Sequence, residues 1–238
     1  MKTVTIIFIL LFSLFLLVSL VFSFEDVKKL SLSAEGIREL QIDAGAGSLK
    51  VIGGEGLTAI EVTAEIHVSG VEGKDKEAYF EDHVKLSLDK RGDRAVLESQ
   101  IEQHHVFLFS GEARIDLTIR MPKDTDLRID DGSGSMTVED LKGNVVIEDG
   151  SGDIRVERIE GNLEIDDNSG DIDVKEISGD VSIDDGSGSM YVSAIGGNVV
   201  VEDGSGSIHI DGVEKDVEIK DAGSGGVHLL NIRGRVRR

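Results

Sequence analysis

Short pairs of apolar residues, spaced two apart, recur every 18 residues over the second half of the chain. This spacing places each pair on one face of a β-strand. Each pair follows the motif Asp-Gly-Ser-Gly or a close variant of it. The closing glycine of the motif falls at Gly134, Gly152, Gly170, Gly188 and Gly206, and again at Gly225 after one inserted residue. A short constant period of this kind predicts a stack of coils.

Each complete coil offers five apolar side chains that we expect to face inward. In one coil these are Ile154, Val156, Ile159, Leu163 and Ile165. A single coil cannot bury them alone, so neighbouring coils must pair their backbones along strands about 4.8 Å apart. The pattern therefore predicts an all-β parallel β-solenoid (a β-helix or β-roll) with coils of about 18 residues over residues 126–238. Residues 25–125 carry alternating runs at 84–88, 95–101 and 113–119 without a constant period, and we expect irregular coils that open the same solenoid.

The corners of the coils are predicted from small residues at constant positions. Positions 132, 150, 186 and 204 are glycine and position 168 is asparagine, the residue types that most readily adopt a positive φ. A second glycine column at 143, 161, 179 and 197 predicts another tight corner in each coil.

The first 24 residues have the character of an export element. Val4 to Phe24 is a nearly unbroken apolar run preceded by Lys2, which predicts an N-terminal helix that is either a transmembrane anchor or a cleaved signal peptide. In both cases the remainder is delivered outside the cytoplasm, to the cell surface or another extracytoplasmic location, and residues 4–24 hold it to the membrane if they are not cleaved. The chain has no cysteine, which excludes an acylated lipoprotein anchor and disulfide bonds.

The charge of the chain excludes several classes of partner. Its 46 acidic residues outnumber 25 Lys and Arg, giving a net charge of −21, so nucleic acid and anionic lipid headgroups are poor partners. The one dense basic cluster consists of Arg233, Arg235, Arg237 and Arg238. We expect it to discourage pairing at an open sheet edge; the alternative is contact with an acidic partner or a membrane surface.

The candidate metal site is a column of aspartates that open the repeated motif: Asp131, Asp149, Asp167, Asp185, Asp203 and Asp221. Stacked coils bring these like charges close together, so the column needs a physical reason. The favoured one is that each carboxylate accepts a hydrogen bond from a backbone N–H two residues on and closes the turn. The alternative is calcium between the coils, bound by carboxylate and carbonyl oxygens, although the spacing matches neither an EF-hand nor a nine-residue calcium roll.

Nothing else in the sequence predicts catalysis or a cofactor. The six histidines lack zinc spacing, the repeated serines lack the surroundings of a nucleophile elbow, and no phosphate-binding loop is present. His209 and His228 occupy equivalent outward positions in consecutive coils, which predicts a surface stack. Residues 103–109, with His104, His105, Phe107 and Phe109, are the aromatic concentration outside the export element. They are predicted to form a hydrophobic plug over the first coil or a loop that contacts a partner.

A family resemblance rests on residues 40–51, on residues 119–129 and on the Gly-Ser-Gly coils behind them. In these segments the chain resembles the prokaryotic putative-adhesin family, an exported domain of unknown function and β-solenoid type. The resemblance covers roughly residues 34–238. It implies a solenoid in an exported or membrane-tethered protein, and it carries over no catalytic or binding residue.

Export, repeat and resemblance together predict a non-catalytic protein of the cell envelope or surface. We expect an adhesin-like or structural module whose partner is an envelope polymer or a membrane protein. Two alternatives stay open: a membrane-tethered accessory of an envelope-stress signalling system, and a surface protein that depends on calcium.

Overall fold

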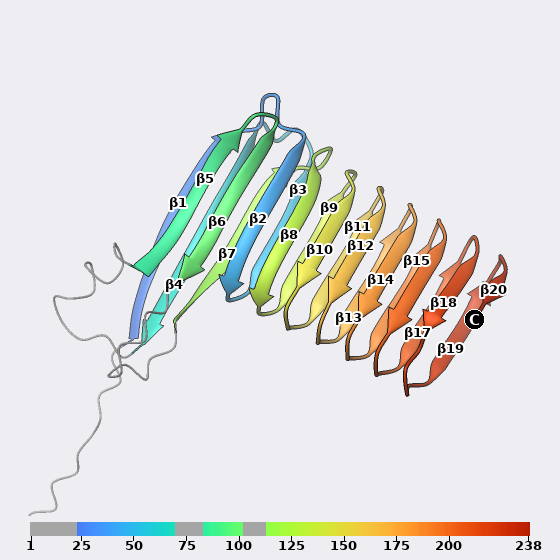
Figure 1. Ribbon diagram of the computed structural model, residues 1–238. Helices are drawn as coiled ribbons and strands as arrows, with labels where there is room; N and C mark the ends of the chain where they lie inside the picture. The colour runs from blue at the N-terminus through green and yellow to red at the C-terminus, as the bar shows by residue number, and fades with distance from the viewer. Residues whose placement is uncertain (1–22, 70–82, 102–112) are drawn as a thin grey trace, which may run out of the picture.

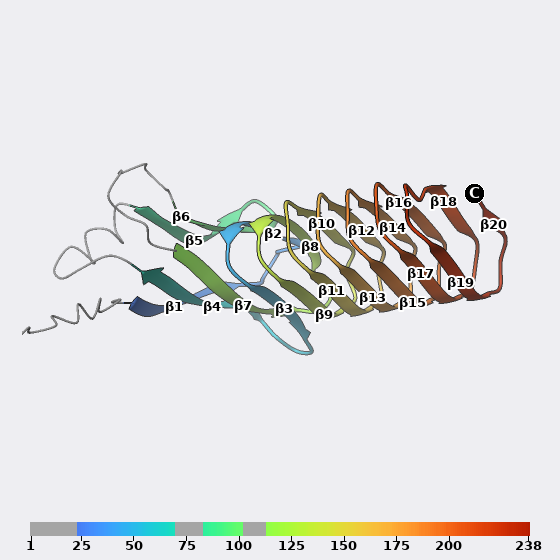
Figure 2. The same ribbon diagram turned by 90° about the horizontal axis from the view of Figure 1, so that it is seen from below.

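The computed structural model describes residues 23–69, 83–101 and 113–238 of the chain. These residues form two ten-stranded sheets that face each other along the whole length of an elongated molecule (Figures 1 and 2). Each turn of the chain contributes one strand to each sheet, so a coil has two sides. The fold is all-β and mostly parallel, as the repeat predicts.

The strands of the first sheet, in spatial order, are β1 (Ser23–Ser33), β4 (Ala59–Ser69), β7 (Ala113–Pro122), β3 (Leu49–Gly54), β9 (Met136–Leu141), β11 (Ile154–Ile159), β13 (Ile172–Ile177), β15 (Met190–Ile195), β17 (Ile208–Val213) and β19 (Val227–Ile232). The strands of the second sheet, in spatial order, are β20 (Val236–Arg237), β18 (Val217–Asp221), β16 (Val199–Asp203), β14 (Val181–Asp185), β12 (Leu163–Asp167), β10 (Val145–Asp149), β8 (Asp126–Ser133), β2 (Glu39–Ala46), β6 (Arg94–Ile101) and β5 (Val84–Arg91).

In the regular coils each residue lies beside the same position of the next coil. Ile154 of β11 pairs with Met136 of β9 on one side and with Ile172 of β13 on the other. The five predicted apolar positions are buried, and they form one continuous core from the first coil to the last but one. The core therefore consists of columns of aliphatic side chains that run along the solenoid axis.

The opening part of the solenoid does not follow chain order. Strands β2 and β3 form one coil, yet they lie between the coil of β6 and β7 and the coil of β8 and β9. The edges of this part are antiparallel, because β1 pairs with β4, β4 with β7, and β5 with β6 in that sense. The sequence predicts strands in this region, but it predicts neither the inserted coil nor the antiparallel pairs.

The N-terminal helix predicted for residues 1–24 falls almost entirely outside the described residues. Strand β1 already begins at Ser23, within the last two residues of that segment. Within residues 23–69, 83–101 and 113–238, no helix has the length and apolar character needed to cross a membrane.

The left-handed backbone lies at other positions than the predicted corners. Positive φ angles occur at the closing glycines of the motif, such as Gly152 with a φ of 137°, rather than at positions 132, 150, 168, 186 and 204. A second left-handed column includes Ala194 (φ 56°) and Gly212 (φ 74°), between the paired residues of the first sheet. The first glycine of each motif is needed for a different reason, which is that the backbones of adjacent coils come close together there. A Cβ at Gly150 would lie 2.5 Å from the carbonyl oxygen of Gly132.

Two glycine-to-alanine substitutions should separate steric exclusion from backbone strain. A Cβ at Gly152 would lie 1.9 Å from the carbonyl oxygen of Gly134, so Gly152→Ala should cost about 3 kcal/mol or more of unfolding free energy. Gly212 also has a positive φ, but its nearest contact would be 3.6 Å, so Gly212→Ala should cost about 1 to 2 kcal/mol. Denaturant unfolding measures both, and equal losses would contradict the contact geometry.

Candidate functional site

The aspartate column lies inside the solenoid. In β14, Val181 and Ile183 point into the core, and Asp185 occupies the next inward position of the same strand. The other regular coils repeat this pattern, and the five aspartates are between 0% and 4% exposed. Each coil thus has six inward side chains, one more than the sequence pattern predicts. The aspartate ladder, as we call it, comprises Asp131, Asp149, Asp167, Asp185 and Asp203.

Small apolar residues close the ladder at both ends. Ala44 of β2 pairs with Asp131. At the other end the register of β16 and β18 shifts, so that Glu202 rather than Asp203 lies opposite Asp221. Asp221 is exposed, while Ala222 packs against the core. The prediction that Asp221 continues the column is therefore wrong, because the inserted residue moves it to the outer face.

Part of the ladder makes the hydrogen bonds that turn capping requires. The backbone N–H of Ser169 donates to Oδ1 of Asp167, and that of Ser187 donates to Oδ1 of Asp185, both at 3.0 Å. Asp221 accepts a similar bond from Gly223 at 2.9 Å in its exposed turn.

Seven buried carboxyl oxygens of the ladder have no hydrogen-bond partner. They are both oxygens of Asp149 and Asp203, and Oδ2 of Asp131, Asp167 and Asp185. The backbone N–H groups of Ser151 and Ser205 lie near Asp149 and Asp203 and partly offset the rise in their pKa values, but outside hydrogen-bond geometry. Burial raises the pKa of Asp131 to about 7, and the nearby charge of Asp149 adds to the effect. Burial likewise raises the pKa of Asp149 and of Asp185 to about 6, and it raises those of Asp167 and Asp203. Charged forms of these groups are disfavoured because they leave water without gaining a counter-charge.

The structure does not show a preformed set of metal ligands at the predicted calcium site. Within residues 23–69, 83–101 and 113–238, no group of three or more His, Cys, Asp or Glu residues is arranged to hold a metal ion. Calcium between the coils stays a prediction.

A second polar ladder, which the repeat pattern alone did not predict, runs along the opposite corner of the coils. Each member accepts a hydrogen bond, 2.7–3.3 Å long, from the backbone N–H at the equivalent position of the next coil. This corner ladder consists of Asp126, Asn144, Asn162, Asp180, Asn198 and Asp216. Its signal was present in the sequence as Asn or Asp directly after the second glycine column.

A shallow groove of about 620 Å³ follows this corner across five coils of the second sheet. The corner ladder forms one wall. The floor consists of the outward residues at the start of β10, β12, β14, β16 and β18, among them Val146, Ser182 and Val200. The side-chain amides of Asn144 and Asn198 also donate within the ladder, to Oδ1 of Asp126 and of Asp180. The groove thus combines a wall of asparagine and aspartate side chains with a mixed floor that includes valine, glutamate and serine side chains.

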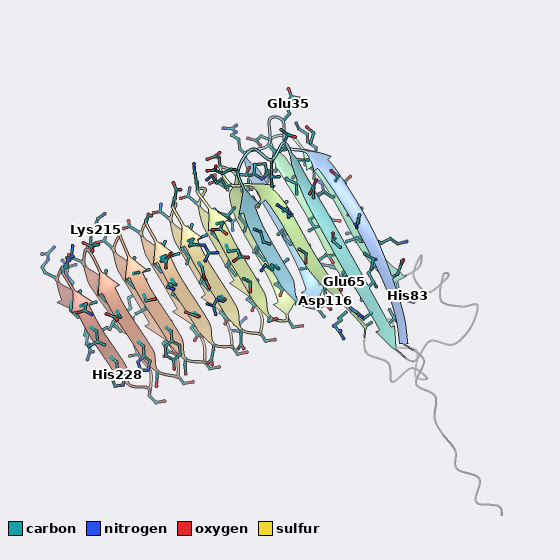
Figure 3. All side chains as sticks on the ribbon, turned by 180° about the vertical axis from the view of Figure 1, so that it is seen from behind. Glu35, Glu65, His83, Asp116, Lys215 and His228 are labelled. Carbon is teal, nitrogen blue, oxygen red and sulfur yellow. The ribbon has the colours of Figure 1, made fainter. Side chains whose placement is uncertain are left out.

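The predicted histidine stack is confirmed and includes one more ring. The rings of His209 and His228 lie 4.6 Å apart, and Tyr191 stacks on His209 at 4.9 Å. His228 belongs to β19 of the first sheet and lies at the opposite edge of the coils from Lys215, which is in the turn between β17 and β18 (Figure 3). The stack is therefore separate from the groove.

The two remaining predicted contact regions have different outcomes. His104, His105, Phe107 and Phe109 lie outside the described residues. In the basic cluster, Arg233 pairs with Glu214 and Arg235 pairs with Asp216 of the preceding coil. These two arginines are thus tied to the final coils.

Repeat, register and inward columns define this protein as a two-sided parallel β-solenoid with an irregular opening. The chain belongs to the family described as Toastrack DUF4097, whose match covers residues 37–235. No match was found among the curated proteins.

Several solved structures match the chain at low identity and low TM-score. One is a putative cell adhesion protein from Clostridium sporogenes, with 13% identity, a TM-score of 0.36, and coverage of 90% of this chain and 98% of that chain. A putative adhesin from Bacteroides fragilis has 14% identity, a TM-score of 0.42 and coverage of 89% and 96%. A putative adhesin from Parabacteroides distasonis has 16% identity, a TM-score of 0.37 and the same coverage.

Removing one hydrogen-bond acceptor from the corner ladder should lower the unfolding free energy measurably. Asn162→Ala leaves the backbone N–H of Asp180 without its 2.9 Å acceptor, so we expect a loss of about 0.5 to 1.5 kcal/mol in unfolding free energy. Asn162→Asp keeps the oxygen, as Asp180 and Asp216 do in their own coils, and serves as the matched control. Equal destabilisation by both variants in denaturant titrations would show that the acceptor oxygen is not what matters.

Proposed function

We propose that this protein is an exported, non-catalytic module of the cell envelope that binds an uncharged, hydroxyl-rich polymer along the groove of the second sheet. Its adhesin-like role is to hold the cell surface to that polymer. The apolar residues 4–24 supply export and, if retained, a membrane anchor.

The observation that carries the proposal is the continuity of the groove over five coils. Enzyme and cofactor pockets are usually compact and enclosed. A long open groove instead suits a chain that lies extended along the axis. The coils repeat about every 4.8 Å, so the asparagine or aspartate of each coil can contact successive units of such a chain, while the floor residue differs between coils.

The groove-lining groups suit hydroxyl groups and sugar rings. Asparagine amides donate and accept hydrogen bonds, and carboxylates such as Asp180 accept them. The valine methyl groups of Val146 and Val200 offer an apolar surface for the C–H face of a ring. Individual contacts of this kind are weak, so repetition along the groove would supply most of the affinity.

The negative charge of the protein favours an uncharged polymer over an anionic one. The net charge of −21 and the glutamates at the groove, Glu164 and Glu218, repel phosphate-rich or uronate-rich chains. An uncharged glycan meets no such repulsion. Binding to it should therefore resist salt, whereas binding through the arginines should not.

The test is cosedimentation of the full chain, in a nonionic detergent, with the stripped envelopes of its host over a salt series. We expect saturable binding that persists at high salt. Ser182→Arg fills the middle of the groove floor and should weaken binding about tenfold, equivalent to about 1.4 kcal/mol. Ser193→Arg makes the same change on the outer face of the other sheet and should leave binding unchanged.

Two results would count against this function. If both arginine variants bind as the unmodified chain does, the groove is not the binding surface. If binding is absent or vanishes at moderate salt, the tethered accessory of a membrane partner becomes the better account of the chain.

A further inference from the structure

The aspartate ladder poses a problem that the polymer-binding proposal does not address. Five carboxyl groups are stacked within the core, and both oxygens of Asp149 and Asp203 are buried without a hydrogen-bond partner. If all five were ionised, each inner charge would face two like charges about one strand spacing, or 4.8 Å, away. Such an arrangement needs a counter-ion.

Neighbouring strands supply no positive charge to the ladder. Within the described residues, no ion pair involves any of the five aspartates. The charged groups that act on the ladder from its own strands, from the facing turns and from the last coil are carboxylates: Asp130, Asp153, Asp166, Asp171 and Asp221. The counter-ion must therefore come from solution.

A proton needs fewer oxygen ligands than a metal ion does. A calcium ion needs six to eight oxygen ligands, whereas one proton needs two oxygens, one as donor and one as acceptor. Adjacent coils each bring one carboxyl group to the column, and those groups hold the buried oxygens that lack partners.

We propose that the aspartate ladder is an internal proton-binding column, in which carboxyl groups of adjacent coils share protons through O–H···O hydrogen bonds. A protonated aspartate donates its hydrogen to an oxygen of the next aspartate, which removes one charge and satisfies two buried oxygens together. Ala44 and the shifted Ala222 bound the column, so the five aspartates form a closed set.

Proton binding makes the stability of the solenoid depend on pH in a defined direction. The pKa of each ladder carboxyl is higher in the folded chain than the ordinary value of 3.8. The stabilisation is therefore complete below that ordinary value and is lost as the pH rises through about 6 to 7. Surface carboxylates such as Glu139 and Asp140 have lowered pKa values because of Lys50 and Arg158, so their contribution is lost only under more acidic conditions.

The experiment compares unfolding of the full chain in a nonionic detergent at pH 5 and at pH 8, followed by circular dichroism with a chelator present. We expect the folding equilibrium constant to fall at least about tenfold from pH 5 to pH 8, because one aspartate with a pKa near 6 already accounts for that change. Constant stability over this range would overturn the proposal.

A matched pair of variants on β14 separates the ladder from the general effect of negative charge. Asp185→Asn places a neutral amide in the column, keeps an oxygen for the N–H of Ser187, and should reduce the fall in stability between pH 5 and pH 8. Asp184→Asn removes the same charge from the exposed face of the same strand and should leave the fall unchanged. Identical pH profiles for the two variants would assign the effect to overall charge and contradict the proposal.

Two further measurements keep the test decisive if Asp185→Asn does not fold. Unfolding the unmodified chain at pH 6 in weak buffer should release protons, because the folded state binds more of them; no release would refute the column. Calcium in place of chelator should leave stability at pH 8 unchanged. A calcium-dependent gain in stability at pH 8 that is accompanied by loss of the proton release at pH 6 would make the metal ion, not the proton, the counter-ion.

Discussion

The structure depends on in-register stacking, because parallel coils of constant length place every residue beside its own equivalent in the next coil. The backbone hydrogen bonds between coils impose this register, and the 18-residue period preserves it from β8 to β17. A side chain at any position of the repeat therefore has the residues at the same position of the adjacent coils above and below it, as Arg155 has Thr137 and Asp173. A residue suits this fold when it packs well against the residues at the same position of the adjacent coils.

At most positions of the repeat, the side chains of adjacent coils pack favourably against one another. Aliphatic side chains pack into continuous rows, asparagine and aspartate at the outer corner pass hydrogen bonds from coil to coil, and the rings of Tyr191, His209 and His228 stack. Glycine recurs where the backbone of one coil touches that of the next. Aspartate in the core is the exception, since a column of identical buried charges is unfavourable unless a counter-ion joins it. The aspartate ladder and the groove of the second sheet thus both result from the in-register stacking of the coils. The ladder faces the core, and the groove faces solvent.

The sequence predicts the regular coils well because their period is constant and their apolar positions are unambiguous. The inward direction of the aspartates was present as simple alternation from Val181 through Ile183 to Asp185, but a charged residue is ordinarily assigned to the outer face. Asp221 lies outside the aspartate ladder because one residue is inserted in the last repeat. The sequence does not show where the strand register shifts to accommodate this residue, whereas the pairing of β16 with β18 does. The insertion of β2 and β3 between later strands is a long-range choice that no local pattern encodes. The groove likewise depends on corners brought together from five coils.

The most direct test of this account is a carboxyl-carbon NMR titration of the full chain with labelled aspartate, from pH 3 to pH 9. We predict that Asp131, Asp149 and Asp185 titrate at about pH 6 to 7, with broad and mutually dependent curves. If every aspartate titrates near its ordinary value of 3.8, the carboxyl groups are not stacked in a proton-sharing core, and the account of the ladder is wrong.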